Sequence, residues 1–144
     1  MNTRFPRRIA SAARRLHRCF QMDARLFVRA LGWRLALPAL RRIVPLRSLV
    51  HLMQRTSPRP SPARLDAVRF FAAHGGRIVM SPHCLERSLV LYRFLGEAGA
   101  RPTLVLGANG APSGLAGHAW IEINGEPFAD APDYAPVLAF DGQP

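Results

Sequence analysis

Apolar residues recur at helical spacing in the first third of the chain. Asp23 precedes a run in which leucine, phenylalanine and alanine alternate with arginine, and this pattern predicts a helix that begins at an Asp23 cap and is interrupted at Pro38. A second apolar run over 39–53 predicts another helix, kinked at Pro45. The first third of the chain is therefore expected to be helical.

These helices have wide apolar faces. We expect residues such as Leu31, Trp33 and Leu35 to pack on the rest of the domain and the intervening arginines to point outward. The alternative is that such faces bind a lipid surface or a partner helix.

A proline-rich stretch divides the chain. Residues 56–62 read T-S-P-R-P-S-P, which predicts a short extended linker between an Arg-rich helical segment, residues 1–57, and a second segment, residues 58–144. A further helix is expected over 62–73. At 144 residues the chain has room for one domain with a real core, but not for two ordinary ones.

The next helix is predicted to carry the candidate chemistry. Ser81 is a good N-cap, Pro82 suits the first helical position, and Cys84 then falls third, within the first turn, before an apolar run that stops near Gly99. A thiol in the first turn feels the free N–H groups and the positive end of the helix dipole, which stabilise negative charge on sulfur.

The last third of the chain is expected to form strands. An apolar strand over 103–108, a loop over 109–115 and a second strand over 117–123 are followed by Asn124-Gly125, a strong hairpin signal, and by a return strand over 126–130. A last apolar piece covers 137–140. Helices followed by a small antiparallel sheet predict an α+β fold.

The length of the hairpin loop decides which residues face each other. A two-residue Asn-Gly loop pairs Ile123 with Glu126 and turns His118 and Asp130 to opposite faces of the sheet. A three-residue loop, with Gly125 in the left-handed conformation, sets His118 directly across from Asp130. We favour the three-residue loop.

Cysteine catalysis requires a thiolate, a base that forms and keeps it, and a third group that orients the base. Cys84, His118 and Asp130 supply these three types in this order. Each residue alone has an ordinary interpretation: a buried small hydrophobe, a structural histidine and a turn residue. The combination indicates a catalytic site, for which the Cys84 backbone N–H is the one oxyanion donor that the sequence nominates.

The charge of the chain is uneven. Residues 1–64 hold 15 arginines and one acid, residues 65–144 hold five arginines and eight acids, and the formal net charge is +11 without any lysine. A basic chain raises nucleic acid or an anionic membrane as partners. Arginine without lysine, beside abundant alanine and proline, is equally explained by a genomic composition bias, and we expect no nucleic-acid partner.

Two cysteines, Cys19 and Cys84, do not make a disulfide framework. No run of roughly 18 apolar residues is free of arginine, so no transmembrane helix is expected. The N-terminus lacks an uncharged apolar region followed by a cleavage site. We expect a cytoplasmic protein without metal or cofactor.

Four pieces of sequence carry a resemblance to a known family. They are S-P-H-C-L-E-R-S-L-V-L-Y-R-F-L (81–95), L-V-L-G (104–107), G-H-A-W-I-E-I-N-G (117–125) and F-A-D (128–130). Over roughly residues 60–141 the chain resembles the transglutaminase-like cysteine peptidases that remove the leader from lasso-peptide precursors. H-A-W alone occurs across transglutaminase-like folds, whereas C-L-x-R-S-L followed by H-A-W-[VI]-E and a later Asp is more specific.

The resemblance implies a papain-like α+β core in which Cys84 is the nucleophile, His118 the base and Asp130 the orienting acid. It also implies a ribosomal precursor peptide as substrate and a separate ATP-dependent, asparagine-synthetase-like cyclase as the next enzyme. Some members of the family carry a strand-rich leader-binding module ahead of the peptidase. Residues 1–55 look helical instead, so the chain resembles the split form, which needs a separate leader-recognition protein.

Two other interpretations stay open. A related Cys-His-Asp enzyme, such as an acyltransferase or a transglutaminase proper, would transfer the acyl group to an amine or a cofactor instead of water. A non-enzymatic adaptor would bind acidic peptide, membrane or nucleic acid through its Arg-rich first half.

Overall fold

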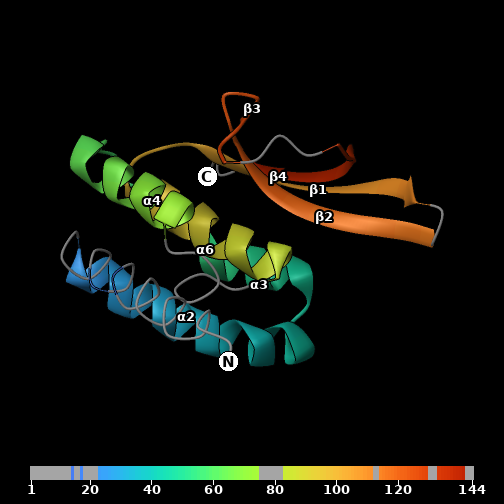
Figure 1. Ribbon diagram of the computed structural model, residues 1–144, viewed down its shortest axis with the longest axis horizontal. Coiled ribbons are helices and arrows are strands. Elements are labelled where there is room, and N and C mark those ends of the chain that lie inside the picture. Colours follow the sequence, from blue (N-terminus) through green and yellow to red (C-terminus); the bar gives the residue numbers. More distant parts are fainter. Residues whose placement is uncertain are drawn as a thin grey trace, which may run out of the picture.

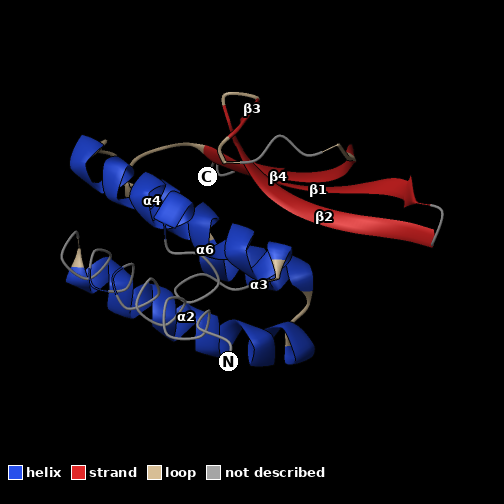
Figure 2. Cartoon of the chain, in the orientation of Figure 1, coloured by secondary structure: helices blue, strands red, loops and turns tan. Residues whose placement is uncertain are grey.

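The computed structural model describes residues 14, 17, 23–74, 83–111, 114–129 and 133–141, and everything below concerns these residues. Four helices are followed by an antiparallel four-stranded sheet of order β3-β2-β1-β4, which confirms the α+β class (Figures 1 and 2). The elements are α2 (Ala24–Ile43), α3 (Leu46–Met53), α4 (Pro62–His74), α6 (Cys84–Glu97), β1 (Pro102–Ala111), β2 (Gly114–Ile123), β3 (Glu126–Pro127) and β4 (Ala135–Asp141).

Helix α6 lies at the centre of this arrangement. Helices α2, α3 and α4 all contact α6, and α6 in turn contacts β1 and β2. One core joins the outer helices, α6 and the sheet, because Leu89 and Leu95 of α6 are fully buried together with Leu37 of α2 and Leu104 of β1. In Figure 1 the helices gather on one side of the sheet and the β1–β2 hairpin reaches past them.

Helix α2 runs through Pro38, so the predicted interruption is wrong. The helix begins at the predicted cap, where the Leu26 N–H donates to the Asp23 side chain at 2.9 Å. Proline removes one backbone hydrogen bond, but burial of Leu37 immediately before it holds the helix to the core. The helix ends before Pro45, where Val44 takes the extended conformation that a following proline favours.

The face of α2 that packs inward differs from the predicted one. Leu35 is 80% exposed, so its predicted docking role is wrong, whereas Trp33 is partly buried against the core as expected. Arg29 is exposed, as expected, but it is also bound to α6. Its guanidinium lies over the Phe94 ring and donates to both oxygens of Glu97 on α6, at 2.6 and 2.8 Å. These bonds to Glu97 raise the pKa of Arg29.

The proline-rich linker lies against the end of α6. The Ser57 N–H donates to the Gly96 carbonyl at 3.0 Å, and the Ser61 N–H donates to the Ala98 carbonyl at 2.9 Å. A Cβ at Gly96 would collide with the Arg55 carbonyl. Glycine at position 96 is therefore what lets the linker approach this closely.

The β1–β2 hairpin is longer than the sequence predicts. The expected loop over 109–115 is mostly paired strand, with Asn109 opposite Ala116 and Gly110 opposite Leu115. Asparagine and glycine have low strand propensity and suggested a loop, but pairing along the rest of the hairpin extends through them.

The favoured three-residue hairpin loop is wrong. Asn124 and Gly125 both have positive φ, 55° and 81°, and form a two-residue turn that pairs Ile123 with Glu126. Paired strand β3 then ends at Pro127. The predicted partner of His118, Asp130, lies outside the described residues.

Two helical glycines give a matched test of the packing at the end of α6. Gly96→Ala is expected to lower the free energy of unfolding by about 1–3 kcal/mol, because the added methyl meets backbone that cannot easily yield. Gly32→Ala in α2, where nothing lies within 4 Å of the added methyl, should raise it by about 0.5–1 kcal/mol. Urea unfolding followed by circular dichroism measures both. Equal effects of the two substitutions would contradict the docked linker.

Candidate active site

Cys84 is the first residue of α6. The prediction that it lies in the first turn of a helix is confirmed, but the residue before it, His83, is the N-cap and makes no capping bond through its side chain. Ser81 and Pro82, the predicted cap and first helical residue, lie outside the described residues. The first N–H groups of a helix have no partner within the helix, so Cys84 sits where backbone donors favour negative charge.

Ser88, one turn after Cys84, fixes α6 to strand β2. Its buried hydroxyl donates to the Ala119 carbonyl at 2.9 Å. This carbonyl is on the edge of β2 away from β1, the edge on which the Ile121 carbonyl accepts from the Phe128 N–H at 2.8 Å. The Ser88–Ala119 bond thus fixes the first turns of α6 to β2 at the residue that follows His118.

His118 projects from the opposite face of β2 to Ala119. Alternation along the strand buries Ala119 and Ile121 on the side of α6 and places His118 and Trp120 together on the other side. The His118 and Trp120 rings are nearly parallel, at 19°, with centroids 6.3 Å apart. The His118 ring is therefore packed along Trp120 on this face.

A second aromatic ring lies against His118. The Tyr134 ring stacks on the imidazole with centroids 5.0 Å apart and planes 25° apart. Asn109 of β1 fixes the chain just before this tyrosine, because its side-chain amide donates to the Asp133 carbonyl at 3.3 Å. The imidazole is thus oriented by packing as well as by any acid that hydrogen-bonds to it.

Gly107 makes room for these aromatic rings. It lies opposite His118 in the β1–β2 pairing, and a Cβ there would come within 2.6 Å of the Trp120 ring and 2.7 Å of the Ala135 carbonyl. Any larger residue at position 107 would displace Trp120 or the start of β4.

A buried carboxylate lies in the first turn of α6. Glu86, two residues after Cys84, is 1% exposed. It forms an ion pair with Arg41 of α2, whose Nε is 3.7 Å from Oε1. A buried carboxylate is costly unless it is paired, so the N-terminal helix supplies a charge that the catalytic helix needs.

The structure places Cys84 at the start of α6 and His118 on β2, two elements that the Ser88–Ala119 bond joins. No hydrogen bond joins the Cys84 thiol to the His118 ring among the described residues, and Asp130 and Cys19 lie outside them. Sequence reasoning missed the roles of Ser88, Trp120 and Tyr134. The first two carry a recognisable signal, since Ser88 is four residues after Cys84 on a helix and Trp120 two after His118 on a strand.

The described residues contain no group of three histidine, cysteine, aspartate or glutamate side chains that could hold a metal ion. No helix in the described ranges is long and apolar enough to cross a membrane.

Comparison with known proteins gives one match. The sequence model of the transglutaminase-like superfamily matches residues 27–139, a span that begins within the predicted Arg-rich segment and ends in β4. No curated protein and no solved structure matches the chain.

The aromatic contacts of His118 can be tested without any assumption about the reaction. Tyr134→Leu is expected to shift the His118 ring resonances in a proton–carbon NMR spectrum, because the ring current of the stacked tyrosine is lost. Tyr134→Phe should keep them, and Gly107→Ala should move them by displacing Trp120. Tyr92→Phe, a change in buried α6, serves as the control. Unmoved His118 resonances in Tyr134→Leu would rule out the stacking.

Proposed function

The chain belongs to the transglutaminase-like superfamily, and on this premise we propose that it is a cysteine peptidase that removes the leader from a ribosomally made lasso-peptide precursor. Membership suggests a cysteine-based peptidase or acyltransferase. The finer assignment is supported by the C-L-E-R-S-L and H-A-W-I-E motifs around Cys84 and His118.

The proposed reaction starts at the Cys84 sulfur. His118 removes the thiol proton, the thiolate adds to the scissile carbonyl carbon, and the carbonyl π electrons move to oxygen. The Cys84 backbone N–H, at the start of α6, is placed to donate to this oxyanion. Collapse breaks the C–N bond as His118 returns its proton to the leaving amine, and leaves a thioester.

Water completes the cycle. His118 takes a proton from a water molecule, which attacks the thioester and releases the leader carboxylate and the Cys84 thiol. The two-residue turn would set Asp130 on the face opposite to His118 only if pairing continued in register, and β3 ends at Pro127. Asp130 is proposed to orient the His118 ring and to stabilise its charged form.

The observation that carries the proposal is the Ser88–Ala119 hydrogen bond. It ties the first turns of the helix that begins with Cys84 to the strand position next to His118. A catalytic thiol and its base need this kind of fixed approach, because proton transfer requires hydrogen-bond reach in the substrate complex.

We further propose that the chain acts with a separate leader-recognition protein, on a precursor that passes afterwards to an ATP-dependent, asparagine-synthetase-like cyclase. The support is the helical character of α2 and α3, which differ from a strand-rich leader-binding module. Both helices also pack against α6 and bury Leu37, Leu49 and Met53 there, so part of each helix is already engaged within the chain.

Substitutions of the three proposed catalytic residues are expected to differ in severity. Cleavage of the precursor, monitored by mass spectrometry, measures the difference. Cys84→Ala should abolish turnover, because no neighbouring group replaces the thiolate, and His118→Ala should lower kcat by about 10³-fold or more, because one imidazole acts as both base and acid. Asp130→Asn should cost less than either, since nucleophile and base remain.

Cys19→Ala and Asp133→Ala are the matched controls, and both should retain turnover. Asp133 has an exposed side chain and is held through its backbone carbonyl by Asn109. If Cys84→Ala, folded by circular dichroism, still cleaves at the parent rate, the peptidase mechanism is wrong. A loss in Asp133→Ala but not in Asp130→Asn would transfer the orienting role to Asp133.

The split form predicts dependence on a partner. The isolated chain should cleave full-length precursor slowly and gain at least about tenfold in kcat/KM when the leader-recognition protein is added, because the partner raises the effective concentration of the scissile bond. Cleavage of a leaderless peptide should not change. Full activity of the chain alone would contradict the partnership while leaving the chemistry intact.

A further inference from the structure

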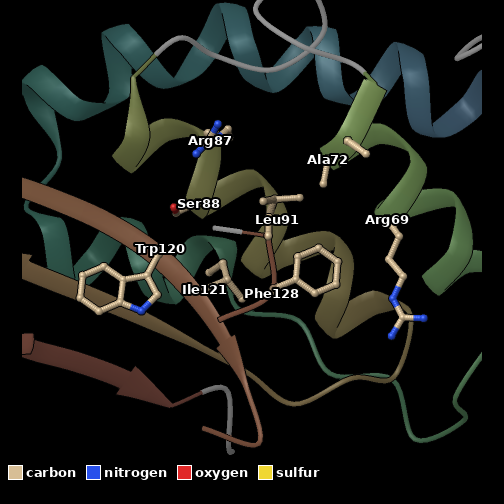
Figure 3. Close-up of a pocket in the computed structure, with 10 residues that line it drawn as sticks. Arg69, Ala72, Arg87, Ser88, Leu91, Trp120, Ile121 and Phe128 are labelled. Carbon is tan, nitrogen blue, oxygen red and sulfur yellow. The ribbon is translucent and has the colours of Figure 1, made fainter. Parts of the chain in front are cut away.

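A pocket of about 400 Å³ opens between α4, α6 and the β2–β3 edge of the sheet (Figure 3). This volume lies within the range of small-molecule sites. It is lined by side chains from both helices and from the strand that carries His118: Arg69, Ala72, Ala73, Arg87, Ser88, Leu91, Trp120, Ile121, Phe128 and Ala129.

The pocket adjoins the candidate active site without containing it. Neither Cys84 nor His118 is among the lining residues, but Ser88 lies one turn after Cys84, and Trp120 stacks with His118. Ala129, also in the lining, immediately precedes Asp130. Lining residues therefore lie near each of the three proposed catalytic residues in the sequence, where a pocket would receive a side chain that flanks the scissile bond.

The lining selects for one kind of side chain. Its wall is mixed: Leu91, Ile121 and Phe128 converge on its centre in Figure 3, and Arg69, Arg87 and Ser88 add polar surface around them. The charged residues of the described lining, Arg69 and Arg87, are both basic. A cationic side chain would meet like charge and apolar surface, so the pocket disfavours lysine and arginine.

Arg69 adds a preference at the rim. Its side chain is 60% exposed, and its ion pair with Asp66 on the same helix is long, at 3.8 Å, between two exposed groups. Such a pair contributes little, so Arg69 can exchange Asp66 for a substrate carboxylate at small cost.

We propose that this pocket binds a large apolar side chain of the substrate peptide close to the scissile bond, with an acidic neighbour favoured by Arg69. The proposal rests on the proposed peptidase function and identifies the chemical class of residue that the enzyme selects.

The experiment uses the full chain and peptidyl chloromethyl ketones, which alkylate an active-site thiol with loss of chloride. Phenylalanine, leucine, glycine and lysine are compared at each of the two positions before the electrophile, and labelling of Cys84 is followed by mass spectrometry. At one of these positions, phenylalanine or leucine should label at least tenfold faster than glycine or lysine. Iodoacetamide, which has no such side chain, reports the intrinsic reactivity of the thiol.

Variants at the wall test that the preference comes from this pocket. Ala73→Phe, which fills the pocket from an exposed position on α4, should reduce the apolar preference to less than threefold and leave iodoacetamide labelling unchanged. Ala63→Phe, equally exposed on α4 but outside the pocket, is the matched control and should keep the full preference. Phe128→Ala removes part of the wall and should also weaken the preference.

The rim is tested in the same way. A peptidyl chloromethyl ketone with glutamate beside its apolar residue should label Cys84 of the parent chain at least threefold faster than the same probe without glutamate. Arg69→Gln should remove that gain. Arg64→Gln, an exposed arginine on the same helix that does not line this pocket, should keep it.

The outcomes separate the pocket from the peptidase function. If every peptidyl probe labels Cys84 faster than iodoacetamide but at one common rate, or if Ala73→Phe keeps the preference, the pocket proposal is overturned and the peptidase stands. If no peptidyl probe labels Cys84 faster than iodoacetamide does, the peptidase proposal itself fails and the pocket assignment falls with it.

Discussion

Burial of α6 on all sides is the constraint on which the rest of the structure depends. Leu89 and Leu95 are inaccessible to solvent and Tyr92 is 1% exposed, so this helix is hydrophobic nearly all round and needs both a helical layer and a sheet to cover it. Three helices cover one side and β1 and β2 cover the other. The position of Cys84 follows from this burial, because a helix fixed along its length also has a fixed first turn.

The N-terminal helices are therefore part of the same structure as the candidate site. Arg29 of α2 reaches Glu97 at one end of α6, and Arg41 reaches buried Glu86 at the other, two residues from Cys84. Solvent screens the exposed Arg29 pair and leaves it little strength, but Arg41 compensates a carboxylate that is almost wholly removed from water. Some of the arginine excess thus has a structural role, whatever the origin of the rest.

Local patterns in the sequence predicted what depends on local structure. The α+β class, the helix that begins around Cys84 and the hairpin at Asn124-Gly125 could all be read from periodicity and turn residues. The errors lie where tertiary packing overrides a local signal. Helix α2 continues through Pro38 because its buried side chains hold it to the core. Asn109 and Gly110 are paired strand residues, and the Asn124-Gly125 turn has the two-residue form.

The candidate site was also predicted only where its features are local in the sequence. The types and order of Cys84 and His118 are visible in the sequence, whereas the contact of Tyr134 with His118 joins segments that only the sheet brings together. The burial of Glu86 is likewise invisible in the local sequence, since Arg41, with which it forms an ion pair, lies on another helix.

The hydrogen bond of Ser88 sets where the first turns of α6 lie along β2. The carbonyls of Ala119 and Ile121 point to the same edge of the strand, because backbone groups alternate along it. At Ile121 this carbonyl accepts from the Phe128 N–H, just after β3, and at Ala119 it accepts from the Ser88 hydroxyl. One edge of β2 is therefore bonded first to the segment that follows β3 and then to α6. Because Ala119 follows His118 and Ser88 is one turn after Cys84, this single bond relates the helix of the proposed nucleophile to the strand of the proposed base.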